Sequence, residues 1–261
     1  MERQGPEHLI DKVADLILSS KKVVVFTGAG VSTESGIPDF RSPGGIWTKY
    51  DPDSFTYQKF VRDAETRGMV WQMLVETFMV GAEPDPAHIA IAELERMGKL
   101  DCVITQNVDN LHQEAGNDPD KVFELHGNMK WALCLSCGKR YPLGEIKKRV
   151  EQGIKDPNCD DCHGILKPDA VFFGESLPER VLREATRRSR ESNLFIVVGS
   201  TLVVTPAAYM PQYAVEAGAK LVIINLSSTP LDGRATVLIQ GKAGETMSKV
   251  MEQVRSKSSS I

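Results

Sequence analysis

The sequence predicts an α/β fold: a Rossmann-like parallel sheet with helices on both faces, interrupted by insertions. First, short unbroken apolar runs alternate with helical stretches along most of the 261 residues. Such runs are typical of strands covered on both faces, and their alternation with helices is typical of a parallel sheet. Second, two segments, 42–81 and 131–166, lack this alternation. Third, polar clusters directly follow several of the expected strands.

The first helix and the first strand show the two sequence patterns from which the other helices and strands are predicted. Pro6 suits the first turn of a helix, and apolar residues then recur at helical spacing up to Ser20. Val23–Phe26 is a continuous β-branched and aromatic run, as expected for a buried strand. The expected strands cover residues 23–26, 102–105, 121–125, 194–198, 221–225 and 237–239. The expected helices cover 6–20, 84–97, a short stretch after 109, 178–190, 206–217 and 245–254.

The two insertions differ in composition from the rest of the chain. Residues 42–81 carry many aromatic side chains without strand patterning, which predicts a small helical module. Residues 131–166 contain four cysteines and few apolar residues, which predicts a metal-stabilised module. We expect the remaining segments, 1–41, 82–130 and 167–261, to form the Rossmann-like domain.

The composition is that of an ordinary globular protein, with 41% apolar residues and a formal net charge of −4. This mildly acidic balance predicts no direct nucleic-acid binding and no attraction to an anionic membrane. The longest apolar runs are far shorter than the ~20 residues of a membrane span. The opening residues lack the apolar region of a secretory signal, so we expect a cytoplasmic protein. Nothing in the composition indicates the oligomeric state.

The cysteines form two C-x-x-C pairs, Cys134/Cys137 and Cys159/Cys162. Two such pairs complete a tetrahedral Cys₄ site, and four protein ligands leave no open position, so we predict one structural Zn²⁺. Cys159 to His163 also matches the c-type haem attachment pattern. Haem attachment requires export and leaves the first pair unexplained. A zinc ribbon can also bind nucleic acid, but the charges of this segment are mixed. Cys102 is expected to be a small core residue.

Five polar segments follow predicted strands, and the carboxyl ends of parallel strands share one edge of a sheet. They are 27–41, 106–109, His126, 199–201 and Asn225. Ligands of open α/β sheets bind outside this edge. The sequence therefore predicts that these segments converge on one binding site.

The glycine turn Gly28-Ala-Gly30 is an imperfect dinucleotide-binding pattern, because the third glycine is absent and Pro38 interrupts any following helix. Further motifs follow it in order: Gly36-Ile-Pro-Asp-Phe-Arg41, Thr105-Gln-Asn-Val-Asp109, His126-Gly127, the two cysteine pairs, Phe172-Phe-Gly-Glu175 and Gly199-Ser-Thr-Leu202. Together they resemble the sirtuins of prokaryotic type, which are NAD-dependent protein lysine deacylases. The resemblance covers residues 13–254. It implies a Rossmann-like domain, a zinc-containing domain and NAD bound between them.

The resemblance assigns catalytic roles to His126, Asn107 and Asp109. His126 would be the general base that deprotonates a hydroxyl of the nicotinamide ribose, a task that suits imidazole. Asn107 and Asp109 would lie at the nicotinamide end, and Gln106 would contact the ribose. On the residues alone, a lone histidine is more often structural, and the polar residues 106–109 could simply cap the short helix.

The resemblance also implies the cofactor contacts. Phe40 would shield the reactive ribose face, Arg41 would meet the phosphates or support a mobile loop, and Asn225 would bind the adenosine ribose. Gly-Ser-Thr at 199–201 departs from the family's usual order but keeps both hydroxyls. The full expected set is Gly28, Ala29, Gly30, Ser32, Asp39, Phe40, Arg41, Gln106, Asn107, Asp109, Gly199, Ser200, Thr201, Asn225, Leu226, Lys242 and Ala243.

The expected peptide site is an extended piece, Val171, Phe172, Phe173, Gly174 and Glu175, whose exposed edge would accept an acylated-lysine peptide as an added strand. Residues 71–78 lack the Tyr-x-x-Arg pair of sirtuins that prefer anionic acyl groups, which predicts acetyl or longer aliphatic substrates. The expected products are nicotinamide, O-acyl-ADP-ribose and free lysine. Two alternatives remain: a protein ADP-ribosyltransferase that uses the same NAD site, and a non-catalytic NAD- or zinc-dependent binding module.

Overall fold

The computed structural model describes residues 6–78 and 81–259. Its larger part is a parallel six-stranded sheet with the order β3-β2-β1-β7-β8-β9. The strands are β1 (Val23–Thr27), β2 (Leu100–Thr105), β3 (Val122–Glu124), β7 (Leu194–Val198), β8 (Lys220–Asn225) and β9 (Val237–Gln240). The order reverses beside β1, which creates a switch point where ligands of such sheets bind.

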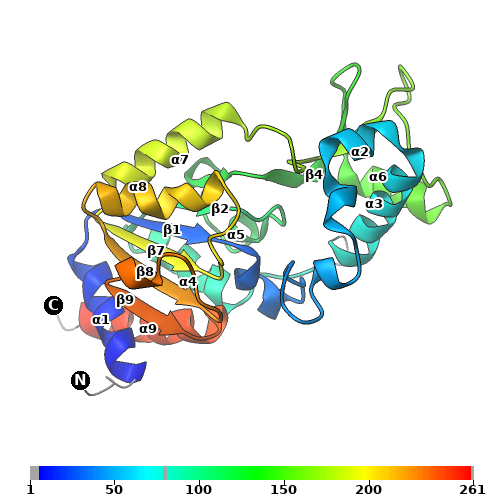
Figure 1. The fold of residues 1–261 in the computed structure, drawn as a ribbon. Coiled ribbons are helices and arrows are strands. Elements are labelled where there is room, and N and C mark those ends of the chain that lie inside the picture. Colours follow the sequence, from blue (N-terminus) through cyan, green and yellow to red (C-terminus); the bar gives the residue numbers. More distant parts are fainter. Residues whose placement is uncertain (1–5, 79–80, 260–261) are drawn as a thin grey trace.

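Helices cover both faces of this sheet, as predicted (Figure 1). On one face lie α1 (Pro6–Ser19), α4 (Pro86–Arg96) and α9 (Ala243–Ser258), and on the other lie α7 (Glu179–Glu191) and α8 (Met210–Glu216). Successive side chains of β1 enter opposite cores: Val23 and Val25 pack on the first face, Val24 and Phe26 on the second. This double burial explains why the strands appear in the sequence as unbroken apolar runs.

The smaller part of the molecule combines both insertions (Figure 1). An antiparallel sheet in the order β5-β4-β6 carries one helix, and two helices of the first insertion pack beside it. Phe60 and Trp71 of the first insertion share a fully buried core with Ile146 and Leu166 of the second. The elements are α2 (Tyr57–Arg62), α3 (Ala64–Thr77), β4 (Gly127–Cys134), β5 (Arg140–Pro142), α6 (Leu143–Glu151) and β6 (Leu166–Ala170).

The antiparallel sheet and helix α6 of the smaller part were not predicted. The extended piece expected at residues 171–175 is not a regular strand, because strand β6 ends at Ala170 and only Phe173 forms an isolated bridge, with Thr56. Pro168 lies inside β6, where it is tolerated because β6 is an edge strand.

The remaining helical elements are short. They are α5 (Leu111–Glu114) and 3₁₀ turns at Ala29–Val31, Thr33–Ser35, Ile46–Thr48, Pro52–Phe55, Pro119–Lys121, Ala207–Tyr209 and Asp232–Arg234. The C-terminal helix α9 is longer than the expected 245–254. None of the helices in the described part of the chain combines the length and apolarity required to cross a bilayer.

Candidate functional site

The glycine turn after β1 packs against the turn after β7. A Cβ added at Gly28 would lie 2.9 Å from the carbonyl oxygen of Gly199, and one added at Gly30 would lie 2.8 Å from it. Both glycines are therefore required by the close approach of two backbone segments. This finding gives a structural reason for a pattern that we interpreted as access for a phosphate.

The backbone N–H groups of this turn are mostly engaged within the protein. Gly28 donates to Val198 and Gly30 donates to Gly199, at 3.2 and 2.9 Å. Among the described residues, the N–H of Ala29 has no hydrogen-bond acceptor. Two 3₁₀ turns follow in place of a long helix. Ala29 is thus the position of the turn at which an N–H is free to bind an anionic ligand.

A polar cavity of about 420 Å³ lies over the carboxyl ends of the parallel strands. It brings together the segments that follow β1, β2, β7 and β8 with the start of α9. The predicted cofactor residues that line it are Gly28, Ala29, Gly30, Asp39, Phe40, Arg41, Gln106, Asn107, Gly199, Ser200, Thr201, Asn225, Leu226, Lys242 and Ala243. His126 lines it as well. The expected convergence of strand-end segments therefore occurs.

A second cavity, of about 240 Å³, lies between the larger and smaller parts and is mostly apolar. Val70, Met73 and Leu74 of α3 form one side of it. All five predicted substrate residues, Val171, Phe172, Phe173, Gly174 and Glu175, line it, as do Ser32 and Asp109. The first insertion thus contributes directly to a cavity, which its aromatic composition alone did not reveal.

His126 lies where the two cavities meet, because it lines both of them, as do Gln106 and Asn107. Its Nδ1 lies 2.9 Å from the carbonyl oxygen of Gln106. Because a carbonyl can only accept, Nδ1 carries the proton and Nε2 keeps its lone pair. Burial lowers the pKa of His126, although the hydrogen bond to Gln106 acts in the opposite direction. The imidazole is therefore neutral and able to accept a proton at pH 7.

Asn107 and Asp109 are joined through Ser32. The amide of Asn107 donates to the Ser32 hydroxyl at 2.9 Å, and this hydroxyl donates to the Asp109 carboxylate at 2.8 Å. Asp109 also accepts from the backbone N–H of Leu111, the first residue of α5, although the N-cap residue of this helix is Asn110. Asp109 therefore both binds the start of α5 and lines the apolar cavity.

A buried polar network beneath Asn107 was not predicted. The Thr105 hydroxyl accepts from the Asn107 backbone N–H and from the Thr27 hydroxyl, which in turn contacts His112 Nε2 at 2.9 Å. The ring of His112 packs 4.8 Å from that of His88. Burial, followed by the neighbouring histidine, holds the pKa of His112 well below its usual value. These groups fix the backbone that carries Asn107.

The segment around Phe40 closes one side of both cavities. Asp39 accepts from the backbone N–H groups of Arg41 and Ser42 and from the Ser42 hydroxyl. Its carboxylate therefore supports the loop as well as facing the cavity. The ring of Phe40 packs 5.1 Å from that of Trp47, which links this loop to the helical module.

The predicted peptide edge is partly occupied. Phe173 donates its N–H to Phe55 and accepts from the N–H of Tyr57, at 3.0 and 2.9 Å. Phe172 donates its N–H to the Glu175 carboxylate at 2.7 Å. Among the described residues, the carbonyl of Val171 and the N–H of Gly174 have no hydrogen-bond partner. The edge is thus narrower than expected, because the helical module already pairs with Phe173.

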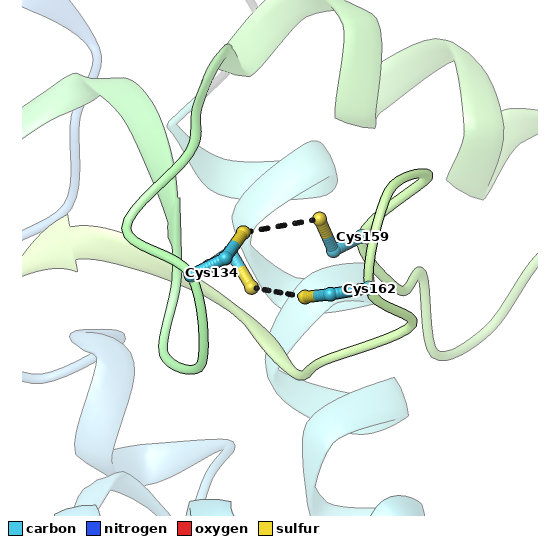
Figure 2. A group of neighbouring side chains, drawn as sticks. Cys134, Cys159 and Cys162 are labelled. Atoms are coloured by element: carbon cyan, nitrogen blue, oxygen red, sulfur yellow. Dashed lines mark hydrogen bonds between the residues drawn. The ribbon is translucent and has the colours of Figure 1, made fainter.

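The four cysteines form one cluster whose sulfur atoms all lie within 4.8 Å of one another. Figure 2 shows the labelled sulfurs of Cys134, Cys159 and Cys162 turned toward one another from two facing loops. The Sγ atoms of Cys134 and Cys162 are 3.5 Å apart, and those of Cys137 and Cys159 are 3.6 Å apart. Four zinc–sulfur bonds of ~2.3 Å in a tetrahedron require similar spacings. The donor set fits one zinc ion.

Several cavity residues were missed by the sequence analysis. Thr33, Glu34 and Ser42 line the polar cavity, and their place in the polar stretch after β1 was a usable signal. Val204 lines both cavities, and no sequence pattern indicated it. Cys102 is fully buried, and burial raises the pKa of its thiol, as expected for a core residue.

Comparisons with known proteins agree with this geometry. Residues 28–206 match the model of the Sir2 family. The chain is 45% identical to NAD-dependent protein deacetylase 1 of Pyrobaculum aerophilum, covering 94% of this chain and 95% of that protein. It is 46% identical to NAD-dependent protein deacylase 2 of Archaeoglobus fulgidus, with coverages of 95% and 97%. A solved Sir2 with a deacetylated p53 peptide and 3′-O-acetyl ADP-ribose superposes with a TM-score of 0.88 at 43% identity, covering 94% of this chain and 98% of that one.

Proposed function

The chain belongs to the Sir2 family, and we propose that its two adjoining cavities perform NAD-dependent protein deacylation, with His126 as the general base. Its relatives carry this activity in their names, and solved relatives hold NAD or acetylated peptide. The enzyme is an NAD-dependent protein deacylase with one structural zinc. It releases nicotinamide, O-acyl-ADP-ribose and free lysine.

One observation carries the assignment of roles. A polar cavity suited to a dinucleotide meets an apolar cavity suited to an acyl chain. His126 lines both cavities and has an unprotonated Nε2. In the reaction, NAD supplies a ribose carbon as the acceptor of the acyl oxygen. His126 accepts a proton from a ribose hydroxyl, and the Asn107 amide orients the ribose.

The remaining predicted residues bind the two substrates. The free N–H of Ala29 and the hydroxyls of Ser200 and Thr201 suit the phosphates of NAD. Asn225 suits the adenosine ribose. Most of the predicted cofactor set is supported by its place in the polar cavity, whereas Ser32 and Asp109 line the adjoining apolar cavity.

The acylated peptide enters as an added strand along the segment after β6. Val171 and Gly174 line the apolar cavity. The open carbonyl of Val171 accepts the amide N–H of the acyl-lysine, while the open N–H of Gly174 binds the peptide backbone. Strand addition with two open backbone groups gives little selectivity for the peptide sequence.

The domain boundaries stay a prediction: a Rossmann-like domain, a helical module at 42–81 and a zinc-binding module at 131–166. Residues 79–80 of the helical module lie outside the described residues. The small sheet extends from Gly127 to Ala170, slightly beyond the zinc-binding segment. The comparisons give no support to the ADP-ribosyltransferase alternative.

The test is the variant His126→Ala, which should reduce deacetylation of an acetyl-lysine peptide by about 10²–10⁴-fold. His8→Ala, an exposed position on α1, is the matched control and should leave the rate unchanged. Because the pKa of His126 is depressed, the wild-type rate should stay level around pH 7 and fall only below the ordinary histidine value near 6.5. Full activity of His126→Ala with an unchanged melting temperature contradicts the assignment.

The acyl preference follows from the apolar wall of the second cavity. Acetyl and longer aliphatic acyl-lysine peptides should be processed, and a succinyl peptide should be poorest, because no arginine of α3 lines this cavity. Rates with acetyl, succinyl and myristoyl versions of one peptide measure this. A succinyl rate equal to the acetyl rate refutes the apolar-pocket account and leaves the role of His126 intact.

A further inference from the structure

Lys167 is a buried cation that the proposed mechanism does not use. It lies in β6 with 5% of its surface exposed. Its ammonium donates to the carboxylate of Glu175 at 2.9 Å and to the carbonyl oxygens of Ala170 and Pro168 at 2.5 and 3.2 Å. It also lies 4.5 Å from the centre of the Phe172 ring. All three ammonium protons therefore have an acceptor.

A buried ammonium is costly, so its retention here calls for a reason. Burial lowers the pKa of Lys167, and Glu175 opposes this shift. An apolar side chain would fill the same space in β6 without that desolvation cost. The ammonium is instead directed out of the small sheet, toward the segment that follows β6.

The acceptors of Lys167 bracket that segment. Ala170 precedes it and Glu175 ends it, so one cation fixes both of its ends. The same Oε2 atom of Glu175 that contacts Lys167 also accepts the N–H of Phe172. Between these anchors lie Val171 and Phe173, which line the apolar cavity.

We propose that Lys167 is a positioning residue for the acylated peptide: acting through Glu175 and the Ala170 carbonyl, it holds residues 171–174 in the shape that receives the acyl-lysine. The inference rests on the proposed function of that segment. Lys167 lines neither of the two cavities, and the polar cavity contains none of its acceptors. Loss of the Lys167 ammonium should therefore weaken binding of the acylated peptide and leave binding of NAD unchanged.

The test compares steady-state constants of the zinc-loaded full chain for an acetyl-lysine peptide and for NAD. Lys167→Met removes the ammonium group and its charge and keeps an unbranched side chain that is one heavy atom shorter. It should raise the KM for the peptide about tenfold and leave the KM for NAD within about twofold. Lys167→Arg should restore most of the peptide KM, because a guanidinium can donate to the same acceptors. Lys249→Met, on the exposed side of α9, is the matched control.

If Lys167→Met does not fold, Glu175→Gln tests the same inference. This substitution weakens the Lys167–Glu175 ion pair with little change in the shape of the side chain. It should show the same split between the two KM values. An unchanged peptide KM in these variants, or an equal rise in both KM values, overturns the inference. Absence of NAD-dependent deacetylation in the wild type would instead overturn the proposed function, so the two failures are distinguishable.

Discussion

The two parts of this molecule are held together by different means. The larger part buries continuous apolar strands on both faces of a parallel sheet, with Val24, Phe26 and Phe195 fully buried. The smaller part has a core assembled from two insertions far apart in the sequence, together with a four-cysteine cluster. The polar cavity lies over the sheet of the larger part, and the apolar cavity lies between the two parts. The proposed cofactor site thus depends mainly on the apolar core of the larger part, while the proposed substrate site also depends on the smaller part and its predicted zinc.

Removal of zinc should produce the largest difference between the two parts. Structural zinc contributes about 10–16 kcal/mol in small zinc-finger peptides, and the segment around the cysteines has few apolar residues of its own. Cys159→Ser should abolish deacetylation and expose residues 131–166 to proteolysis, while the parallel sheet keeps its circular dichroism. Metal content and limited proteolysis measure this. A Cys159→Ser protein that retains activity without metal refutes the zinc-dependent account of the smaller part.

A smaller loss of stability is expected when the ion pair that joins the two insertions is broken. Arg67 of α3 contacts Asp156 at 2.7 Å and also donates to the carbonyl oxygens of Phe60 and Val61. Both charged groups are largely buried, so Arg67→Ala should reduce the free energy of unfolding by about 2–3 kcal/mol. It should also raise the peptide KM, because α3 lines the apolar cavity. Denaturant unfolding and steady-state kinetics measure the two effects.

The control for this variant is Lys249→Ala, which breaks an exposed pair with Glu245 on α9. Such pairs contribute at most about 1 kcal/mol, so little change is expected. Equal destabilisation by the two variants would show that the ion pair between the insertions has no special role.

The same contrast explains what the sequence could predict. The strands of the large sheet could be predicted because strands that are buried on both faces consist of unbroken apolar runs. The candidate site residues could be predicted because the carboxyl ends of these strands share one edge of the sheet. Even Gly28 and Gly30 were recognised, although their physical reason is contact with Gly199 as much as access for a ligand.

The smaller part was harder to predict because its structure depends on contacts that have no local pattern. The resemblance implied an exposed strand edge at residues 171–175. The Lys167–Glu175 pair and the contact with Phe55 shape this segment instead, and both require partners outside it. The cysteine pairs were the exception, since a metal site fixes the spacing of its ligands in the sequence.

We propose that the enzyme transfers an acyl group from lysine to the ADP-ribose of NAD where the two cavities meet. Mass spectrometry of the products from the wild-type enzyme, NAD and an acetyl-lysine peptide tests it most directly. The account predicts equal amounts of nicotinamide, deacetylated peptide and O-acetyl-ADP-ribose. Nicotinamide release with protein-bound ADP-ribose and an unchanged acetyl peptide would contradict it.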